Sequence, residues 1–334
     1  MIEAPDEYAA VEMLHEMGCT DGLPVIVPTP QRVERLVVAT GYPPDASLGI
    51  MGPMMGTCTV EKLAAAAVMA GCLPDHMPIV LAAAMAVVQP EFDLTEMQAT
   101  TFGTAPLIIV NGPAAQACGV AAGFGALGPG HRANASIGRA LRLAMINIGG
   151  GRPGSSDMTL LGHGGKFGQC LAEDQRSPWA QLHTTRGFTA EQSVVTVIGT
   201  EPPHSVIHIG DGDDPESPNR LIDGLAAMLA APGTNNANLG RGQAVVVINP
   251  DQVDHLHRAG HTKASVAERI FERALMRNGK PAFGSPDDVL IVAAGGGGLY
   301  SFVFPTWCAG THRNRAVSVE VEIGQACEVP WATA

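Results

Sequence analysis

The sequence lacks the motifs that identify the common nucleotide and metal sites. None of its three glycine clusters (149–151, 162–165 and 295–298) fits GxGxxG after an expected strand, and no GxxxxGK[ST] motif is present. No HExxH or CxxC spacing fixes a metal geometry, and the pairs His204/His208 and His257/His261 do not replace one. A metal-dependent hydrolase is therefore only an alternative reading.

Aromatic residues and charges are also scarce. At 4% of the chain, aromatic side chains are too few for a surface on which bases or sugars stack. The formal net charge of −12 argues against nucleic acid or an anionic membrane as a partner. Hydrophobic residues make up 46% and charged residues 16%, which indicates a compact protein with a large core. The expected ligand is a small molecule, bound locally against the overall charge.

The cysteines form no disulfide framework. There are seven, an odd number, and they are scattered, which is typical of a reduced, cytoplasmic protein. The acidic start of the chain has no secretory signal pattern. The alanine-rich stretch 63–88 is interrupted by glycine, prolines and charge, so it predicts two core helices joined by a turn and no membrane crossing.

A short pattern recurs along the chain and suggests the fold. Residues 107–110 read as an apolar strand followed by Asn111 and a helix, and residues 245–248 repeat this pattern before Asn249. A third apolar strand is expected at 288–293. Continuous β-branched runs favour parallel strands covered on both faces. We therefore predict an α/β fold with mostly parallel sheets flanked by helices, in two similar lobes (1–192 and 193–334), with an edge or partner-contact strand in the tail 316–334.

The stretch 127–174 is where a site is expected. Glycine-rich loops surround an apolar helix predicted over 135–148, with Asn134 or Ser136 as its N-terminal cap. Arg139 and Arg142 lie on this buried helix, and Arg132 precedes it. A buried guanidinium keeps its proton, so it must meet carboxylates, carbonyls or an anionic ligand. The arginines are thus either partners of Asp157, Glu173 or Asp174 inside the protein, or part of an anion clamp.

The same stretch contains the candidate catalytic residues. If residues 166–173 were helical, Lys166, Cys170 and Glu173 would share one face, and the cation would favour a nucleophilic thiolate. Cysteine is equally a common core residue. His163 is a candidate general acid or base, with an exposed loop histidine as the alternative. Glu173 could orient a base or carry a proton.

The last glycine cluster is a candidate for anion binding by backbone N–H groups. Gly295, Gly296 and Gly297 follow the strand expected at 288–293, at the edge where open parallel sheets bind ligands. Tight turns would require the same glycines.

Several phrases together resemble one family of bacterial proteins of largely unassigned function. They are TDGLPVIVPT (20–29), LGPGHRANASIGRALRL (127–143), RPGSSDMTLLGHGGKFGQCLAED (152–174), SPWAQLH (177–183), VVVINPDQVDHLHRAG (245–260) and DDVLIVAAGGGG (287–298). The resemblance covers nearly the whole chain. It implies an association with small proteins that carry a UGSC-type selenocysteine or cysteine motif, which this chain itself lacks.

These observations lead to one expectation about function and two alternatives. We expect an enzyme of hydrolase or lyase type, with thiol-dependent reductase next, that cleaves or adds across a C–N, C–S, C–O or C–halogen bond of a small anionic substrate. The first alternative is a non-catalytic substrate-binding or scaffold subunit of a thiol- or selenol-dependent enzyme, and the second is the metal-dependent hydrolase. A homo-oligomer or a heteromer with a small (seleno)cysteine-containing subunit is expected. The sequence indicates no particular cofactor.

Overall fold

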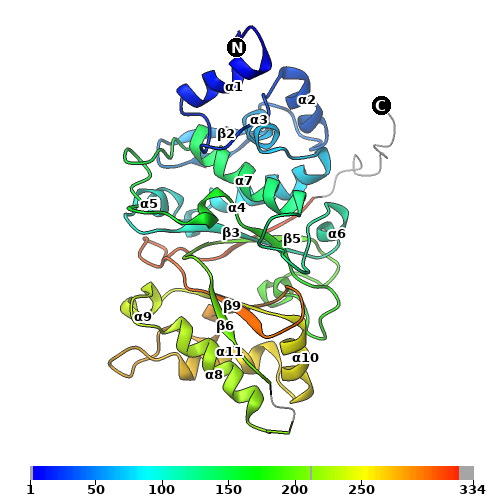
Figure 1. The fold of residues 1–334 in the computed structure, drawn as a ribbon. Helices are drawn as coiled ribbons and strands as arrows, with labels where there is room; N and C mark the ends of the chain where they lie inside the picture. Colours follow the sequence, from blue (N-terminus) through cyan, green and yellow to red (C-terminus); the bar gives the residue numbers. More distant parts are fainter. Residues whose placement is uncertain (1–2, 211–212, 323–334) are drawn as a thin grey trace.

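The computed structural model describes residues 3–210 and 213–322, which fold into four layers (Figure 1). Two four-stranded sheets pack face to face in the middle. Helices α1, α2, α3, α4 and α7 lie beyond one sheet, and α8, α10 and α11 lie beyond the other. The protein is therefore α/β, as predicted.

The helices of the described residues include five short 3-10 segments. The α-helices are α1 (Glu7–Glu16), α2 (Pro30–Val38), α3 (Val60–Ala70), α4 (Met77–Val87), α5 (Leu94–Ala99), α6 (Ala114–Ala117), α7 (Arg132–Asn147), α8 (Ser217–Leu229), α9 (Asn235–Leu239), α10 (Pro250–Arg258) and α11 (Lys263–Arg273). The 3-10 segments are η1 (Pro74–His76), η2 (Pro90–Phe92), η3 (Gly164–Phe167), η4 (Leu182–Arg186) and η5 (Pro286–Asp288).

The strands form a small hairpin and two larger sheets. They are β1 (Ser47–Met51), β2 (Gly56–Thr59), β3 (Ala105–Asn111), β4 (Cys170–Ala172), β5 (Val194–Thr200), β6 (His204–Ile207), β7 (Ala244–Ile248), β8 (Val289–Ala293), β9 (Tyr300–Phe304) and β10 (Val317–Glu320). The sheet orders are β10-β5-β3-β4 and β6-β9-β7-β8. In each sheet only the last pair is parallel, and the other two pairs are antiparallel.

The two sheets have the same pattern of strand directions and exchange their edge strands. Strand β6 follows β5 in the chain but pairs with β9, whereas β10 follows β9 but pairs with β5. The first sheet thus contains strands from both sides of residue 192, whereas all four strands of the second sheet lie after it. Asn111 ends β3 and Asn249 follows β7, so the recurring strand–asparagine pattern occupies equivalent places in the two sheets.

The expectation of mostly parallel sheets is wrong, because each sheet is mixed. The apolar runs are fully buried for a different reason, which is that both faces of each sheet are covered. Leu107 and Ile109 of β3 face the opposing sheet, whereas Ile108 and Val110 face the helices. Burial on both faces demands continuous apolar residues whatever the strand direction.

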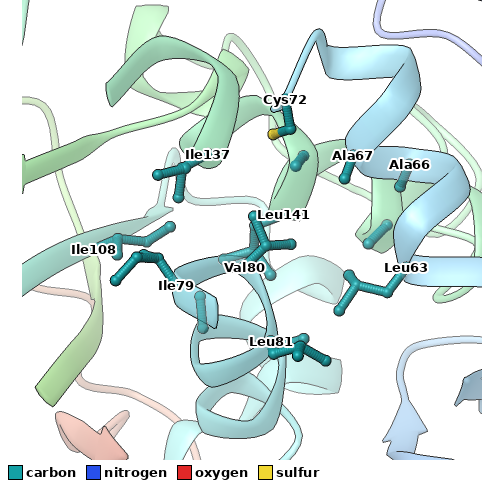
Figure 2. Close-up of a cluster of buried hydrophobic side chains, with 14 of the residues drawn as sticks. Leu63, Ala66, Ala67, Cys72, Ile79, Val80, Leu81, Ile108, Ile137 and Leu141 are labelled. Carbon is teal, nitrogen blue, oxygen red and sulfur yellow. The ribbon is translucent and has the colours of Figure 1, made fainter. Parts of the chain in front are cut away.

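The helical layer over the first sheet is packed through small side chains. Alanines of α3 let α7 approach closely. The larger side chains of the same buried cluster come from four elements: Leu63 of α3, Ile79 of α4, Ile108 of β3, and Ile137 and Leu141 of α7 (Figure 2). The two helices predicted within 60–88 are present. No helix in the described ranges passes the length and apolarity test for a membrane span, although α3 and residues 74–87, bent by 120°, pass it together.

Three local expectations differ from the structure. Residues 25–27 form no strand. Helix α7 starts earlier than predicted, after His131, so Asn134 lies inside its first turn and does not cap it. Residues 164–172 form η3 and β4, so the shared helical face of Lys166, Cys170 and Glu173 is not formed. In the tail, β10 is an edge strand as expected, and the prediction for residues after 322 lies outside the described residues.

Candidate functional site

Loops of the 127–174 stretch surround a pocket of about 430 Å³ in the helical layer. One wall is the loop between α1 and α2, a second is the inner part of α7, and a third is formed by residues 151–157 and η3. The lining residues are Gly18, Thr20, Asp21, Gly22, Arg142, Ile146, Gly151, Arg152, Pro153, Asp157, Lys166 and Phe167. We call this cavity the Arg142 pocket.

Asp157 is the centre of the charge network in the Arg142 pocket. Its two carboxylate oxygens accept from Lys166 Nζ at 3.0 and 2.8 Å, and its Oδ2 lies 3.6 Å from Arg142 Nη1. Lys166 Nζ also donates to Thr159 Oγ1 at 2.7 Å, and Arg142 Nε donates to the Lys166 carbonyl at 2.6 Å. The ion pair expected between the helix arginines and Asp157 therefore exists for Arg142.

Arg139 has a different partner from the three that were considered. Its Nε and Nη2 donate to the Asp21 carboxylate at 2.7 and 2.8 Å, and Nη2 also donates to the carbonyls of Leu23 and Pro24. This bidentate pair fixes the α1–α2 loop on α7. Arg139 is therefore structural, and it neutralises one of the two carboxylates in the pocket lining.

The balance of charge around the pocket favours an anion. Once Asp21 is paired, three cations (Arg142, Lys166 and Arg152) face the single carboxylate of Asp157. The Arg142 side chain is only 7% exposed, and its Nη2 is buried with no hydrogen-bond partner. Burial lowers the pKa of Arg142, although Asp157 and Asp21 oppose that effect. A buried charged donor without a partner is costly, so an acceptor at this point would stabilise the site.

Lys166 has the electrostatic setting of a proton carrier. Burial and then the charge of Arg142 lower the pKa of its amine, while Asp157 acts in the opposite direction. For Asp157, burial acts to raise the pKa, but the hydrogen bond and charge of Lys166 and the hydrogen bonds from Thr159 together outweigh burial, so the pKa of this carboxyl is lowered. A lysine amine whose pKa is lowered in this way releases its proton more readily than one in water.

His163 borders this network as a neutral imidazole. Burial, then Lys166, then Arg142 lower its pKa to about 4. Its Nδ1 accepts from Gly165 N at 3.1 Å, so the proton of the neutral ring is on Nε2, which is buried without a partner. These properties favour a hydrogen-bond donor over a general acid or base at neutral pH.

We expect His163 to stay neutral down to about pH 4. Because its pKa in the native state is lower than in the unfolded chain, the stability tied to the neutral ring is present above the unfolded pKa of about 6.5 and is lost as pH falls toward 4. Replacing His163 by Asn should make the acid-side loss of stability shallower. The check is NMR titration of the ring together with urea unfolding at several pH values. A ring midpoint near that of a free histidine would contradict the assignment.

Glu173 lies away from the Arg142 pocket and is held on all sides. Its Oε2 accepts from Asn111 Nδ2 and Leu182 N, and its Oε1 accepts from Lys263 Nζ and Ala293 N. The side chain is 0% exposed. A carboxylate with four donors has no free lone pair for catalysis, so we assign Glu173 to the joint between the two sheets.

Cys170 lies in the apolar core. It forms part of β4, is 2% exposed and belongs to the same buried cluster as Cys72 and Ile137. Burial, with Cys72 and Cys118 nearby, raises the pKa of its thiol far above the ordinary value. A thiol in this environment is not activated as a nucleophile, and Lys166 does not line its surroundings. We therefore leave Cys170 out of the proposed site.

Two further candidates support the backbone of the protein. Arg132 donates through Nε and Nη2 to the carbonyl of Gly71, which caps α3. Asn134 is buried, and its amide bonds to Ala121 N and O and to the carbonyls of Ala126 and Cys170. Asn134 thus fixes the loop before α7 and does not line the Arg142 pocket.

Gly295 and Gly296, which follow β8, line a separate cavity of about 440 Å³ at the carboxyl ends of β7 and β8, and Gly297 does not line it. A Cβ on Gly296 would lie 2.0 Å from the Phe124 ring, and one on Gly297 would lie 2.6 Å from Asp251. Gly295 N already donates to Ala122 O at 2.7 Å. Close approach explains Gly296 and Gly297, whereas a φ of +100° explains Gly295, where a Cβ would meet no neighbouring atom. The lining of this cavity contains no charged side chain: Gly125, Ala126, Leu127, Gly128, Leu171, Val247, Asn249, Ala294, Gly295, Gly296, Tyr300, Ser301 and Phe302.

Sequence reasoning missed several residues at these cavities. Asp21 and Arg152 line the Arg142 pocket, and Lys263 binds Glu173, yet none was a candidate. The segment GFGALG (123–128) matches GxGxxG, lines the apolar cavity and lies between α6 and α7, so it does not follow a strand directly. The TDG at 20–22 was the available signal for Asp21, because Asp and Gly in a short polar segment mark a loop.

Comparison of the chain with protein-family models, with curated proteins and with solved structures finds no match. The family resemblance stays a prediction, and only the geometry and charge of the site indicate a function.

Proposed function

We propose that the protein is an enzyme that acts on a small organic carboxylate bound in the Arg142 pocket. The observation that carries this proposal is the buried, partnerless Nη2 of Arg142 beside a pocket in which three cations face the single carboxylate of Asp157, because Asp21 is paired with Arg139. A carboxylate group suits this position because the planar guanidinium donates to two oxygens at once. The ligand is then held against the overall negative charge of the chain by local contacts only.

Lys166 would move the proton in the reaction. With its pKa lowered by burial and Arg142, the amine can take a proton from carbon or return one to a leaving heteroatom. This suits lyase or hydrolase chemistry at a C–N, C–S, C–O or C–halogen bond next to the bound carboxylate. His163, neutral with its proton on Nε2, would donate a hydrogen bond to the polarised group without changing its charge.

The test is a thermal-shift screen of acetate, glycolate, thioglycolate, chloroacetate and malonate against the matching neutral amides. Carboxylates are expected to raise the melting temperature and amides are not, because ligand binding to the native state stabilises it. Replacing Arg142 by Gln should weaken binding by at least about tenfold, and Arg142→Lys should not restore it. Arg273→Gln, on the exposed end of α11, is the matched control. Equal shifts for acids and amides would refute the proposal.

A non-catalytic substrate-binding subunit is the second proposal, and the position of Cys170 favours it. If the reaction needs a thiol or selenol, the buried Cys170 cannot supply it, and a partner would have to do so. In that case Lys166→Gln leaves the chain's own turnover at zero, as in the wild type, while carboxylate binding persists. Turnover by the wild-type chain alone, lost in Lys166→Gln with binding retained, would decide for the enzyme.

The described residues offer no group of side chains that would support the metal-dependent alternative. Within residues 3–210 and 213–322, no three or more His, Cys, Asp or Glu side chains are grouped so that they could hold a metal ion. We also propose that the two sheets mark two similar lobes, supported by their common strand order and by the equivalent places of Asn111 and Asn249. The boundary at residue 192 stays a prediction.

A further inference from the structure

A second cationic cavity of about 510 Å³ lies along the edge strand β8, between α11 and η4. Its lining contains three cations from three separate elements, Arg186, Lys263 and Arg315, and one carboxylate, Asp287. None of these residues lines the Arg142 pocket. We call this cavity the Arg186 pocket.

Arg186 is the cation in this pocket whose charge is not matched. Its Nε donates to Ser318 Oγ and its Nη2 donates to the Ala316 carbonyl, which fixes its orientation. Within the described ranges, Nη1 has no hydrogen-bond partner and no carboxylate forms an ion pair with the guanidinium. Two neutral acceptors orient this arginine without neutralising it, which is how a pre-organised anion ligand is held.

The other two cations of the pocket already have carboxylate partners. Lys263 is paired with Glu173, and Arg315 is paired with Asp288 at 2.8 Å, so neither carboxylate serves Arg186. Burial and then the charge of Arg315 lower the pKa of Arg186, which means that the two guanidinium groups repel each other across the pocket. A bound anion between them would convert this repulsion into attraction.

We propose that the Arg186 pocket binds the phosphate group of a small molecule, between the guanidinium groups of Arg186 and Arg315. A tetrahedral dianion can accept from both guanidinium groups at once, and arginine forks match phosphate oxygens. The cavity is much larger than one phosphate, so the remainder of the ligand would lie along β8 toward Ala264 and Ala267. This site is independent of the proposed carboxylate site and does not depend on it.

The test is calorimetric titration of the full chain with inorganic phosphate and, separately, with glycerol 3-phosphate. Arg186→Gln should weaken binding by at least about tenfold. Arg186 also holds β10, so a second variant avoids that contact: Asp287→Asn removes an exposed negative charge from the lining and should tighten binding by about twofold to fivefold. Arg142→Gln and Arg273→Gln should leave this affinity unchanged.

The pattern across the variants decides the outcome. Loss in Arg186→Gln, gain in Asp287→Asn and no change in Arg142→Gln would support the site. Tighter binding of glycerol 3-phosphate than of inorganic phosphate would identify an organic phosphate as the ligand, and the reverse would identify phosphate itself. No binding of either probe by the wild type, or loss in Arg142→Gln with retention in Arg186→Gln, would overturn the proposal.

Discussion

Replacing Lys263 by methionine is expected to lower the free energy of unfolding by about 3–5 kcal/mol, because it leaves the Glu173 carboxylate buried without its counter-ion. The pair is deeply buried, with Lys263 11% exposed and Glu173 0%. Glu173 also accepts from Asn111 of one sheet and from Ala293 of the other, so the unpaired charge would fall on the joint between the two sheets.

Urea unfolding of three variants measures this effect. Arg32→Met is the matched control, since Arg32 and its partner Glu7 are 43% and 59% exposed, and an exposed pair contributes about 0–1 kcal/mol. The double variant Glu173→Gln with Lys263→Met should be more stable than Lys263→Met alone, because it removes the uncompensated charge. If Lys263→Met cost no more than Arg32→Met, the buried pair would not be the joint that we describe.

Replacing Gly138 by alanine is expected to destabilise the protein by about 2–3 kcal/mol, the cost of overpacking a filled interior. Gly138 lies inside α7, where alanine normally favours the helix by about 1 kcal/mol. Here a Cβ would lie 2.7 Å from Gln169 N and 2.9 Å from the Gly168 carbonyl carbon. Both atoms belong to the backbone that leads from η3 into β4, which cannot move aside as a flexible side chain would.

Gly224 provides the matched control for this prediction. It also lies inside a helix, α8, but a Cβ there would meet only Val206 at 3.7 Å, an ordinary contact. Gly224→Ala should therefore raise stability by about 0.5–1 kcal/mol. The two melting temperatures should shift in opposite directions. Stabilisation by both substitutions would show that the η3–β4 segment does not press on α7.

The candidate site could be located from the sequence, but not completed. Arginines on an apolar helix beside glycine-rich loops indicate a site because buried charges need partners, and that reasoning led to Arg142, Asp157 and Lys166. It offered the wrong partners for Arg139 (Asp157, Glu173 or Asp174), because Asp21 is more than a hundred residues away in the chain and pairs with it only after the α1–α2 loop lies against α7. Long-range pairs of this kind leave no spacing in the sequence.

Cys170 and Glu173 were predicted as catalytic residues, and the structure places both outside the Arg142 pocket. Their spacing from Lys166 suggested one helical face, but the chain forms only the short η3, which ends at Gly168, and β4 then places Cys170 in the core. Close packing of Gly168 against Gly138 selects this path. Local spacing cannot anticipate a choice that depends on another element's backbone.

Hydrophobic periodicity and the cost of burying charge act locally. The amino-acid sequence alone was therefore enough to place most helices and strands and to show that Arg139 and Arg142, on a buried helix, need carboxylate, carbonyl or anionic partners. Only the tertiary structure decided the strand directions, the exchange of β6 and β10 between sheets, and which cations share a pocket. These depend on how distant segments pair, and a buried strand has the same apolar composition whether its neighbour is parallel or antiparallel.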